Sequence, residues 1–256
     1  MIIKHTTTND IPALRQLWKQ AFGDEDSFLD AFFSLGYAPE RSLCAREDGK
    51  PVAALYWFDQ QWRDRTVAYV YGVATEQSYQ NRGICSKLMK RLERLLKERG
   101  YYGIILVPRE PGLVAFYERL GYVVATTLCH YRLPAAGDPD PEFRQIPWEK
   151  YAFYRQQFLP EESVLPGAEM YQLLETYQGF YRCSAGIFCG AAEETPEGRI
   201  LRVQEFLGEP RGAFTAITAM GCKGAILRLR GGAPFGLFRC LTKEKEMPKY
   251  IGLVMD

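Results

Sequence analysis

The stretch over residues 66–99 constrains the fold of this chain more than any other. It begins with the apolar, β-rich run TVAYVYGVA, passes through a short polar turn and continues as a helix with one apolar side. A strand that leads directly into an amphipathic helix predicts an α/β fold, with the helix packed on a sheet. The apolar stripe of the helix consists of Ile84, Leu88, Leu92, Leu95 and Leu96.

The turn YQNRGICS puts a glycine and a cation where this helix begins. Gly83 has no Cβ, so the backbone can approach a ligand closely, and Arg82 adds a charged donor. The first amides of a helix lack intrahelical acceptors and lie at the positive end of its dipole, which favours a phosphate. No GKS, GKT or GxGxxG is present, so this is neither a Walker loop nor a dinucleotide fingerprint. By itself the turn also fits an ordinary strand-to-helix connection.

Residues 1–133 contain further elements with clear periodicity or turn signals. The Asp48-Gly49 dipeptide between two apolar runs predicts a β-hairpin, and Thr8 or Asn9 is placed to cap the first helix. The expected order is strand, two helices, three strands, helix, strand, helix, strand. The ranges are 1–5, 9–22, 28–33, 42–48, 51–58, 66–74, 83–99, 101–108, 112–120 and 122–133.

The segment PAAGDPDP, residues 134–141, has no periodicity and is rich in proline. We therefore expect a first domain over residues 1–135, a linker over 136–142 and a smaller mixed α/β domain over 143–256. The second domain reads as two helices, then a hairpin, a helix and a strand, with 235–241 and 250–256 as final strands. The order hairpin, helix, strand also occurs in the first domain, which favours a truncated second copy of one fold.

Two separated motifs resemble the GNAT superfamily of N-acetyltransferases. The turn QNRGIC resembles the family motif Q/R-x-x-G-x-G/A, and AFYERLGYVV resembles its short helix followed by G-F/Y and a strand. The order of elements over residues 1–133 agrees. The resemblance implies a strongly twisted mixed sheet with helices on both faces, and acetyl-CoA held where two parallel strands separate. It also implies an acyltransferase in which a primary amine attacks the thioester directly.

The resemblance assigns cofactor-binding residues position by position. Backbone groups near Val73 would meet the pantetheine, and the turn would hold the pyrophosphate. The assigned residues are Val73, Gln80, Asn81, Arg82, Gly83, Ile84, Cys85 and Ser86. We expect no metal, because His5 and His130 do not lie at ligand spacing from any cysteine.

Three residues are candidates for catalysis. Tyr117 matches the tyrosine that, in many members, protonates the departing CoA thiolate, and a phenol is chemically suited to this. The attacking amine must lose a proton to a base or a water chain. Tyr69 and Tyr71 point the same way on the strand before the turn, and either is placed to anchor a water, with Tyr71 as the candidate we retain. Glu76 is the nearest carboxylate, with a solvated turn residue as the alternative reading.

Several residues leave the interpretation open. Cys85 stands where the motif prefers Gly or Ala, and Glu110 falls where many members have an asparagine. These departures motivate an alternative function, a catalytically degenerate module that binds CoA or acyl-CoA as a sensor. Glu205, a carboxylate in an apolar strand, either lines a shared pocket or pairs with Arg202 or Arg228.

The second domain contains a turn that weakly resembles the one at Arg82-Gly83. Arg211-Gly212 also follow a strand and open a helix, but Pro210 fits an ordinary first helical turn, so we expect no CoA there. In some multi-domain members the C-terminal carboxylate enters the catalytic centre, so Asp256 is a further candidate near the amine.

Composition limits the partners. The formal net charge of +1 provides no field for nucleic acid or acidic membranes, and no run approaches 18 apolar residues. The seven cysteines are odd in number and form no CxxC pair, which favours free thiols in a reducing compartment. We expect a two-domain cytoplasmic enzyme whose partners are acetyl-CoA and a small or peptide amine, with no nucleic acid and no membrane. A homodimer is left open.

Overall fold

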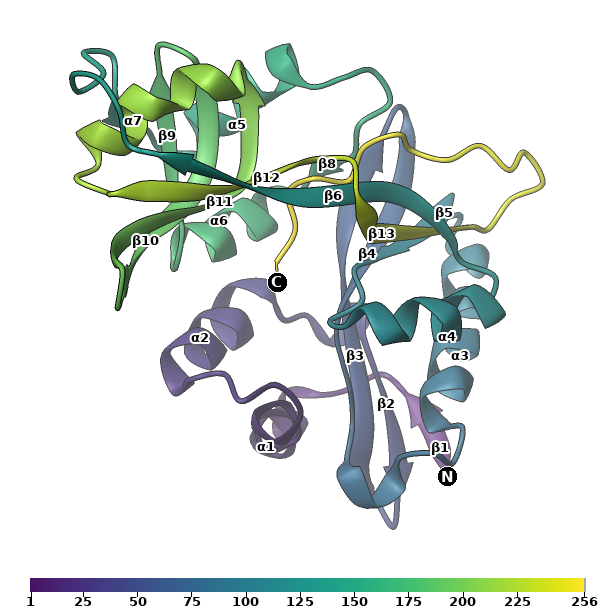
Figure 1. Cartoon of the computed structure of the whole chain (residues 1–256). Helices are drawn as coiled ribbons and strands as arrows, with labels where there is room; N and C mark the ends of the chain where they lie inside the picture. The colour runs from purple at the N-terminus through teal and green to yellow at the C-terminus, as the bar shows by residue number, and fades with distance from the viewer. Residues whose placement is uncertain (256) are drawn as a thin grey trace.

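The computed structural model describes residues 1–255, which form a mixed α/β structure in two lobes (Figure 1). Its 13 strands belong to one twisted mixed sheet in the order β1-β2-β3-β4-β5-β13-β6-β12-β11-β10-β9-β7, and β8 pairs with β3. Helices cover the sheet on both faces, so the expected fold class is confirmed. Among the described residues, no helix combines the length and the apolar character needed to cross a bilayer.

The first ten regular elements follow the predicted order. A capping box formed by Thr7 and Asp10, rather than Thr8 or Asn9, starts the first helical segment. The elements are β1 (Ile2–Lys4), α1 (Ile11–Phe22), α2 (Asp26–Ala31), β2 (Ser42–Glu47), β3 (Lys50–Trp62), β4 (Arg65–Thr75), α3 (Ile84–Glu98), β5 (Gly103–Leu106), α4 (Val114–Arg119) and β6 (Val123–Pro134).

The rest of the described chain follows the expected order of two helices, a hairpin, a helix and a strand. It adds three strands that were not expected, at Arg144–Gln145, Leu165–Pro166 and Gly179–Cys183, and its last segment also differs from expectation. We expected a strand over 250–256, but residues 250–255, the described part of this segment, do not form one: Tyr250 makes a single bridge with Ser163, and the Ile251 amide donates to the Thr126 hydroxyl instead of a neighbouring strand. Asp256 lies outside the described residues. The elements are β7 (Arg144–Gln145), α5 (Trp148–Phe158), β8 (Leu165–Pro166), α6 (Ala168–Glu175), β9 (Gly179–Cys183), β10 (Gly186–Thr195), β11 (Gly198–Gly208), α7 (Ala213–Ala219), β12 (Gly224–Arg230) and β13 (Ala233–Cys240).

Both lobes contain the same succession of elements. In the first lobe the antiparallel pair β3–β4 leads through α3 to β5, which is parallel to β4. In the second lobe the antiparallel pair β10–β11 leads through α7 to β12, which is parallel to β11. The predicted order hairpin, helix, strand in the second half is confirmed, although α7 has only 7 residues against 15 in α3.

A long two-stranded ribbon joins the lobes. The first half of β6 pairs with β13 and the second half with β12, so that Leu128 faces both Arg230 and Ala233 (Figure 1). The strand β13 lies between β5 and β6. Residues Ala233–Cys240, which we expected in a separate second domain beyond a linker at 136–142, are thus hydrogen-bonded into the sheet of the first lobe.

The core lies on both faces of β4. Ala68 and Val70 belong to the buried cluster that includes residues of α3 and α4, whereas Val67 and Tyr69 belong to the cluster on the other face, which includes residues of α1. The stripe on α3 that the sequence predicted is buried, and each of its leucines contributes about 1.5–3 kcal/mol of transfer free energy. This two-sided packing fixes the end of β4, from which the turn and α3 emerge.

Candidate active site

The parallel strands β4 and β5 of the first lobe stop pairing at a defined residue. Their pairing runs from Val67 with Gly103 to Val70 with Leu106, after which β4 continues to Thr75 beside β3 alone. Pro108 lies just beyond the end of β5, and a proline cannot donate to a ladder. The edge of β4 beyond Val70 therefore has no β5 neighbour.

A glycine is required at this point of β4. Gly72 has φ +60°, and a Cβ there would lie 2.5 Å from the Trp18 ring. The strand is kinked here, opposite an irregularity in β3 between Ala54 and Tyr56. The kink brings the end of β4 close to α1.

The turn after β4 presents open amides. Asn81 and Gly83 both have positive φ, 60° and 71°, and Gly83 is the N-cap of α3. The first helical hydrogen bond runs from the Lys87 amide to the Gly83 carbonyl at 3.1 Å. The amides of residues 84–86 consequently have no acceptor within the helix, and a Cβ on Gly83 would meet nothing within 4 Å. This is the geometry of an anion cradle.

The side chains of the turn divide into held and exposed groups. The Gln80 amide nitrogen donates to the Thr75 carbonyl at 3.2 Å and so braces the turn. Asn81 and Arg82 are exposed, and the Arg82 guanidinium lies 5.1 Å from the centre of the Tyr79 ring. Arg82 therefore stands at the surface beside the open amides.

Glu76 is part of the turn scaffold. Its amide donates to the Val52 carbonyl at 2.9 Å, and its carboxylate accepts from the Ser78 hydroxyl at 2.7 Å. Both contacts fix the start of the short 3₁₀ turn Gln77–Tyr79. The carboxylate is half-buried and already engaged within the turn.

On the α3 face, Tyr117 comes together with Val73 and Cys85 in one apolar cluster. The Tyr117 side chain is buried, and burial together with the nearby Cys85 thiol holds the pKa of the phenol well above its ordinary value. Burial raises the pKa of Cys85 to about 11, so both groups are protonated at neutral pH. The sulfur packs against the cluster, on the inner side of the first helical turn.

Tyr71 lies on the opposite face of the sheet. As expected, it points the same way as Tyr69, with ring centres 6.1 Å apart, and it packs against Trp18 at 5.5 Å and Phe32 at 6.1 Å. Tyr71 and Tyr117 thus flank the end of the β4–β5 pairing from two sides.

The loop between β5 and α4 leans toward α1. The Arg109 guanidinium donates to the Ala21 carbonyl and lies 5.5 Å from the centre of the Phe22 ring. Glu110 is exposed and precedes the short turn Pro111–Leu113. The carboxylate is therefore at the surface of the loop.

Glu205 lies in the second lobe, and its expected partners were wrong. The buried carboxylate pairs with Arg155 of α5, with the Nε atom at 2.7 Å, whereas Arg202 pairs with Glu193. Arg228 lies 5.5 Å from the centre of the Phe235 ring. Helix α5 packs directly on β11, which brings Arg155 to this carboxylate.

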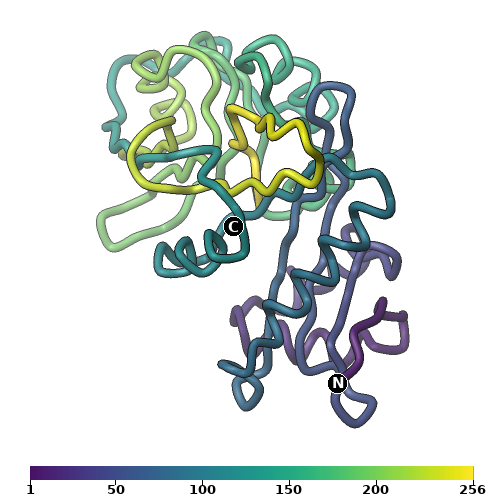
Figure 2. Tube along the Cα trace, turned by 90° about the vertical axis from the view of Figure 1, so that its right-hand side faces the viewer, coloured from purple at the N-terminus to yellow at the C-terminus, as the bar shows by residue number. Residues whose placement is uncertain are grey.

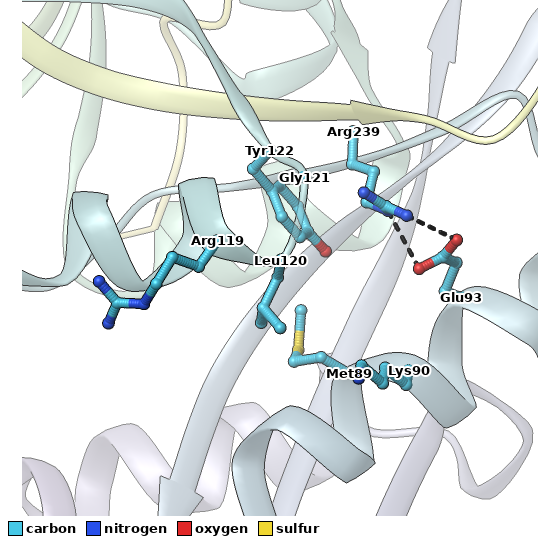
Figure 3. Close-up of a pocket in the computed structure, with 8 residues that line it drawn as sticks. All are labelled: Met89, Lys90, Glu93, Arg119, Leu120, Gly121, Tyr122 and Arg239. Atoms are coloured by element: carbon cyan, nitrogen blue, oxygen red, sulfur yellow. Dashed lines mark hydrogen bonds and ion pairs between the residues drawn. The ribbon is translucent and has the colours of Figure 1, made fainter. Parts of the chain in front are cut away.

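A hollow of about 330 Å³ lies between α3, β13 and the turn after α4 (Figure 3). Arg239 closes one side through a two-pronged ion pair with Glu93, at 2.8 and 3.0 Å. The Tyr122 ring extends into the hollow and packs edge-on against Tyr117, with centroids 5.7 Å apart. The residues that line it include none of those assigned to the cradle. They are Met89, Lys90, Glu93, Arg119, Leu120, Gly121, Tyr122 and Arg239.

Two neighbours of β4 were absent from the sequence-based interpretation. Trp18 of α1 packs on Tyr71 and on the kink at Gly72. The Met255 carbonyl accepts a hydrogen bond from the Tyr69 hydroxyl at 2.9 Å. The sequence placed Trp18 only within the expected helix over residues 9–22, and no local pattern reveals a contact across 186 residues such as that of Tyr69 with Met255.

Known proteins resemble the chain at two levels. Residues 2–125 match the family model described as an acetyltransferase (GNAT) domain. An N-alpha-acetyltransferase of Arabidopsis thaliana, MAK3, is 24% identical over 163 residues, which make up 60% of this chain and 86% of that protein.

Solved structures share the fold over nearly the whole chain. Eis1 from Mycobacterium abscessus superimposes with a TM-score of 0.69 at 14% identity, over 94% of this chain and 74% of its own. A GCN5-related N-acetyltransferase from Anabaena variabilis superimposes with a TM-score of 0.73 at 14% identity, over 94% and 73%. Residues 2–125, which run from β1 into β6, thus match the acetyltransferase (GNAT) domain, and nearly the whole chain shares its fold with these two solved structures.

Proposed function

We propose that this protein transfers the acetyl group of acetyl-CoA to a primary amine by direct attack on the thioester. One observation carries the proposal: Ile84 and Cys85, in the first turn of α3 with its open amides, pack in the same cluster as Tyr117. This cluster also contains Val70 and Leu106, the last paired residues of β4 and β5. This arrangement supports the assignment of an anion cradle and a protonated phenol to one strand junction.

The cofactor would lie along the free edge of β4. The amides of residues 82–86 would hold its pyrophosphate, with Arg82 as an additional cation and Gln80 and Asn81 shaping the turn. Backbone groups near Val73 have no β5 neighbour, so they are available to the amides of the pantetheine. The thioester would then reach the Val73–Tyr117 cluster.

Tyr117 would act as the acid. As the amine nitrogen bonds to the carbonyl carbon and the C–S bond breaks, the phenol donates its proton to the departing thiolate. Burial keeps the phenol neutral before the reaction, because it raises the pKa. Solvent returns a proton to the phenolate in the next step.

The amine would approach from the Tyr71 face. We propose that the Tyr71 hydroxyl anchors a water that takes the proton from the amine. Glu76 is less suited to act as the base directly, because its carboxylate already accepts the Ser78 hydroxyl. The aromatic rings around Tyr71 favour an amine that carries an apolar or cationic body.

The strand pairing supports a division of the chain that differs from two consecutive domains. We propose that residues 1–134 and 233–255 form the acetyltransferase unit and that residues 135–232 are a lobe inserted before its last strand. The order β5-β13-β6 is the reason, since β13 closes the first sheet. We propose a cytoplasmic location, because none of the seven cysteines, all of which are among the described residues, is in a disulfide.

An amine panel tests the proposal. The protein is mixed with acetyl-CoA and spermidine, tryptamine, kanamycin or a tetrapeptide with a free amino terminus, and thiol release is recorded. Release that depends on one of these amines supports the transferase. Calorimetric binding of acetyl-CoA without release from any amine would favour the alternative motivated by Cys85 and Glu110, a CoA-binding sensor. Absence of both binding and release would overturn the proposed function.

A further inference from the structure

A fully buried polar network lies where the second lobe meets the end of the described chain. The Glu205 carboxylate accepts four hydrogen bonds, two from the Arg155 guanidinium at 2.7 and 2.9 Å and one each from two tyrosines. Tyr151 donates to one oxygen at 2.9 Å and Tyr250 to the other at 3.0 Å. The exposed fraction of each of these four side chains is at most 6%. Every lone pair of the carboxylate is thus engaged.

Tyr250 differs from the other members because it opens the segment Tyr250–Met255, here called the strap. The Tyr250 carbonyl accepts from the Val164 amide at 3.0 Å, while its hydroxyl reaches Glu205. The next amide, of Ile251, donates to the Thr126 hydroxyl at 3.0 Å. The strap is therefore attached to both lobes at its start.

The route of the strap is sterically defined. A Cβ on Gly252 would lie 2.0 Å from the Tyr250 hydroxyl oxygen, so the chain passes tightly over the ring it has just left. The residues that follow are buried, and the strap ends where the Met255 carbonyl accepts from the Tyr69 hydroxyl. In both views the last part of the chain, drawn in yellow, runs between the lobes (Figures 1 and 2).

We propose that the strap Tyr250–Met255 forms a wall of the amine-binding side of the active site, and that Glu205 of the second lobe is its positioning residue, acting through Tyr250. The inference rests on the proposed function and deepens it by stating what the second lobe does. The partner of the strap on β4, Tyr69, is stacked on Tyr71. Because the strap lies on the face opposite to α3, its displacement changes the amine side and leaves the pyrophosphate cradle intact.

The charges within the network favour a fixed geometry. The Arg155 cation offsets the Glu205 anion, and burial together with that carboxylate keeps the pKa of Tyr250 well above its ordinary value. The Tyr250 phenol is therefore a permanent donor at physiological pH. The Tyr250 hydroxyl therefore keeps its proton in the range in which acetyl transfer would be assayed.

The chain offers a matched pair of variants. Tyr250→Phe and Tyr151→Phe each remove one buried phenol hydrogen bond of nearly equal length from the same carboxylate. Tyr151 belongs to α5 and has no covalent neighbour in the strap. A merely structural role for the network predicts the same outcome for both variants, whereas positioning of the strap predicts a difference.

Two measurements are made on the full chain. Hydrogen–deuterium exchange of a peptide covering residues 250–255 reports the strap and needs no activity. Initial rates with the fastest amine of the panel above report KM for the amine and for acetyl-CoA separately. We expect Tyr250→Phe to accelerate exchange of the strap and to raise KM for the amine about fivefold, as for one lost hydrogen bond, with KM for acetyl-CoA within about twofold. Tyr151→Phe should leave both nearly unchanged.

The outcomes separate this inference from the proposed function. Equal exchange of the strap in the two variants overturns the positioning role of Glu205, whether or not any amine reacts. Faster exchange in Tyr250→Phe with unchanged KM for the amine overturns the role of the strap as an acceptor wall. If no amine reacts with the wild type, the proposed function fails and the acceptor role fails with it, while the exchange data still decide the attachment. Gly252→Ala, which must displace the Tyr250 ring, should reproduce the effect of Tyr250→Phe.

Discussion

Replacing Gly83 by alanine tests the cradle without disturbing the core. Gly83 has φ +71°, and a Cβ there would meet no protein atom within 4 Å. The cost is therefore backbone strain alone, about 1–2 kcal/mol for a left-handed alanine, partly offset by the lower entropy of the unfolded chain. We expect the unfolding temperature to fall by about 2–4 °C per kcal/mol lost.

The same substitution should have a larger effect on the cofactor. The new methyl group would stand beside the open amides and keep a phosphate out of hydrogen-bond reach of one of them. Each such bond to a charged group contributes about 1.5–3 kcal/mol, so the affinity for acetyl-CoA should fall roughly 10- to 100-fold. Isothermal titration calorimetry of the variant and the wild type measures this directly.

Gly100, at the other end of the same helix, provides the control. It has φ +77° and equally open surroundings, so Gly100→Ala should cause a similar loss of stability. It is remote from the amides of residues 84–86 and should bind acetyl-CoA like the wild type. If Gly83→Ala and Gly100→Ala bind acetyl-CoA equally well, the start of α3 is not the phosphate site.

Three further predictions follow from burial and pairing. Tyr117→Phe should lower kcat about 10²-fold or more with little change in the dissociation constant of acetyl-CoA, and an unchanged kcat would remove Tyr117 from the mechanism. Because the pKa of Tyr117 is raised, the wild-type pH–rate profile should show no fall from this group below pH ~10. With a pKa of about 11, Cys85 is a thiolate in only about one molecule in ten thousand at pH 7. Partial burial opposes ionisation of Cys240, but hydrogen bonds to its sulfur lower its pKa, so iodoacetamide should modify Cys240 first. Mass spectrometry that finds Cys85 modified first would contradict this. Glu205→Leu leaves the Arg155 cation buried and unpaired and should cost about 3–5 kcal/mol in urea unfolding, and a loss below about 1 kcal/mol would show that the pair is not desolvated.

Local patterns sufficed for the elements that build the candidate site. The α3 stripe, the hairpin turn at Asp48-Gly49 and the glycine at the helix start are properties of neighbouring residues, and the structure reproduces each of them. The side on which Tyr69 and Tyr71 lie also followed from strand alternation.

The pairing of strands that are distant in the sequence could not be predicted from local patterns. Residues 235–241 read correctly as a strand, but nothing local shows that β13 is inserted between β5 and β6. The run YIGLVM resembled a strand because it is apolar, yet it is buried as an extended strap with few backbone partners. Arg155 lies on α5, a helix without a clear apolar side. The periodicity of this helix therefore did not indicate that Arg155 is the partner of Glu205.

A crystal structure of the protein soaked with CoA is the most direct test of the account. We predict that the diphosphate lies within hydrogen-bond distance of the amides of residues 83–86, with the thiol beside Tyr117. A diphosphate bound elsewhere, for example in the hollow between Lys90 and Arg119, would contradict the assignment of the cradle and the mechanism built on it.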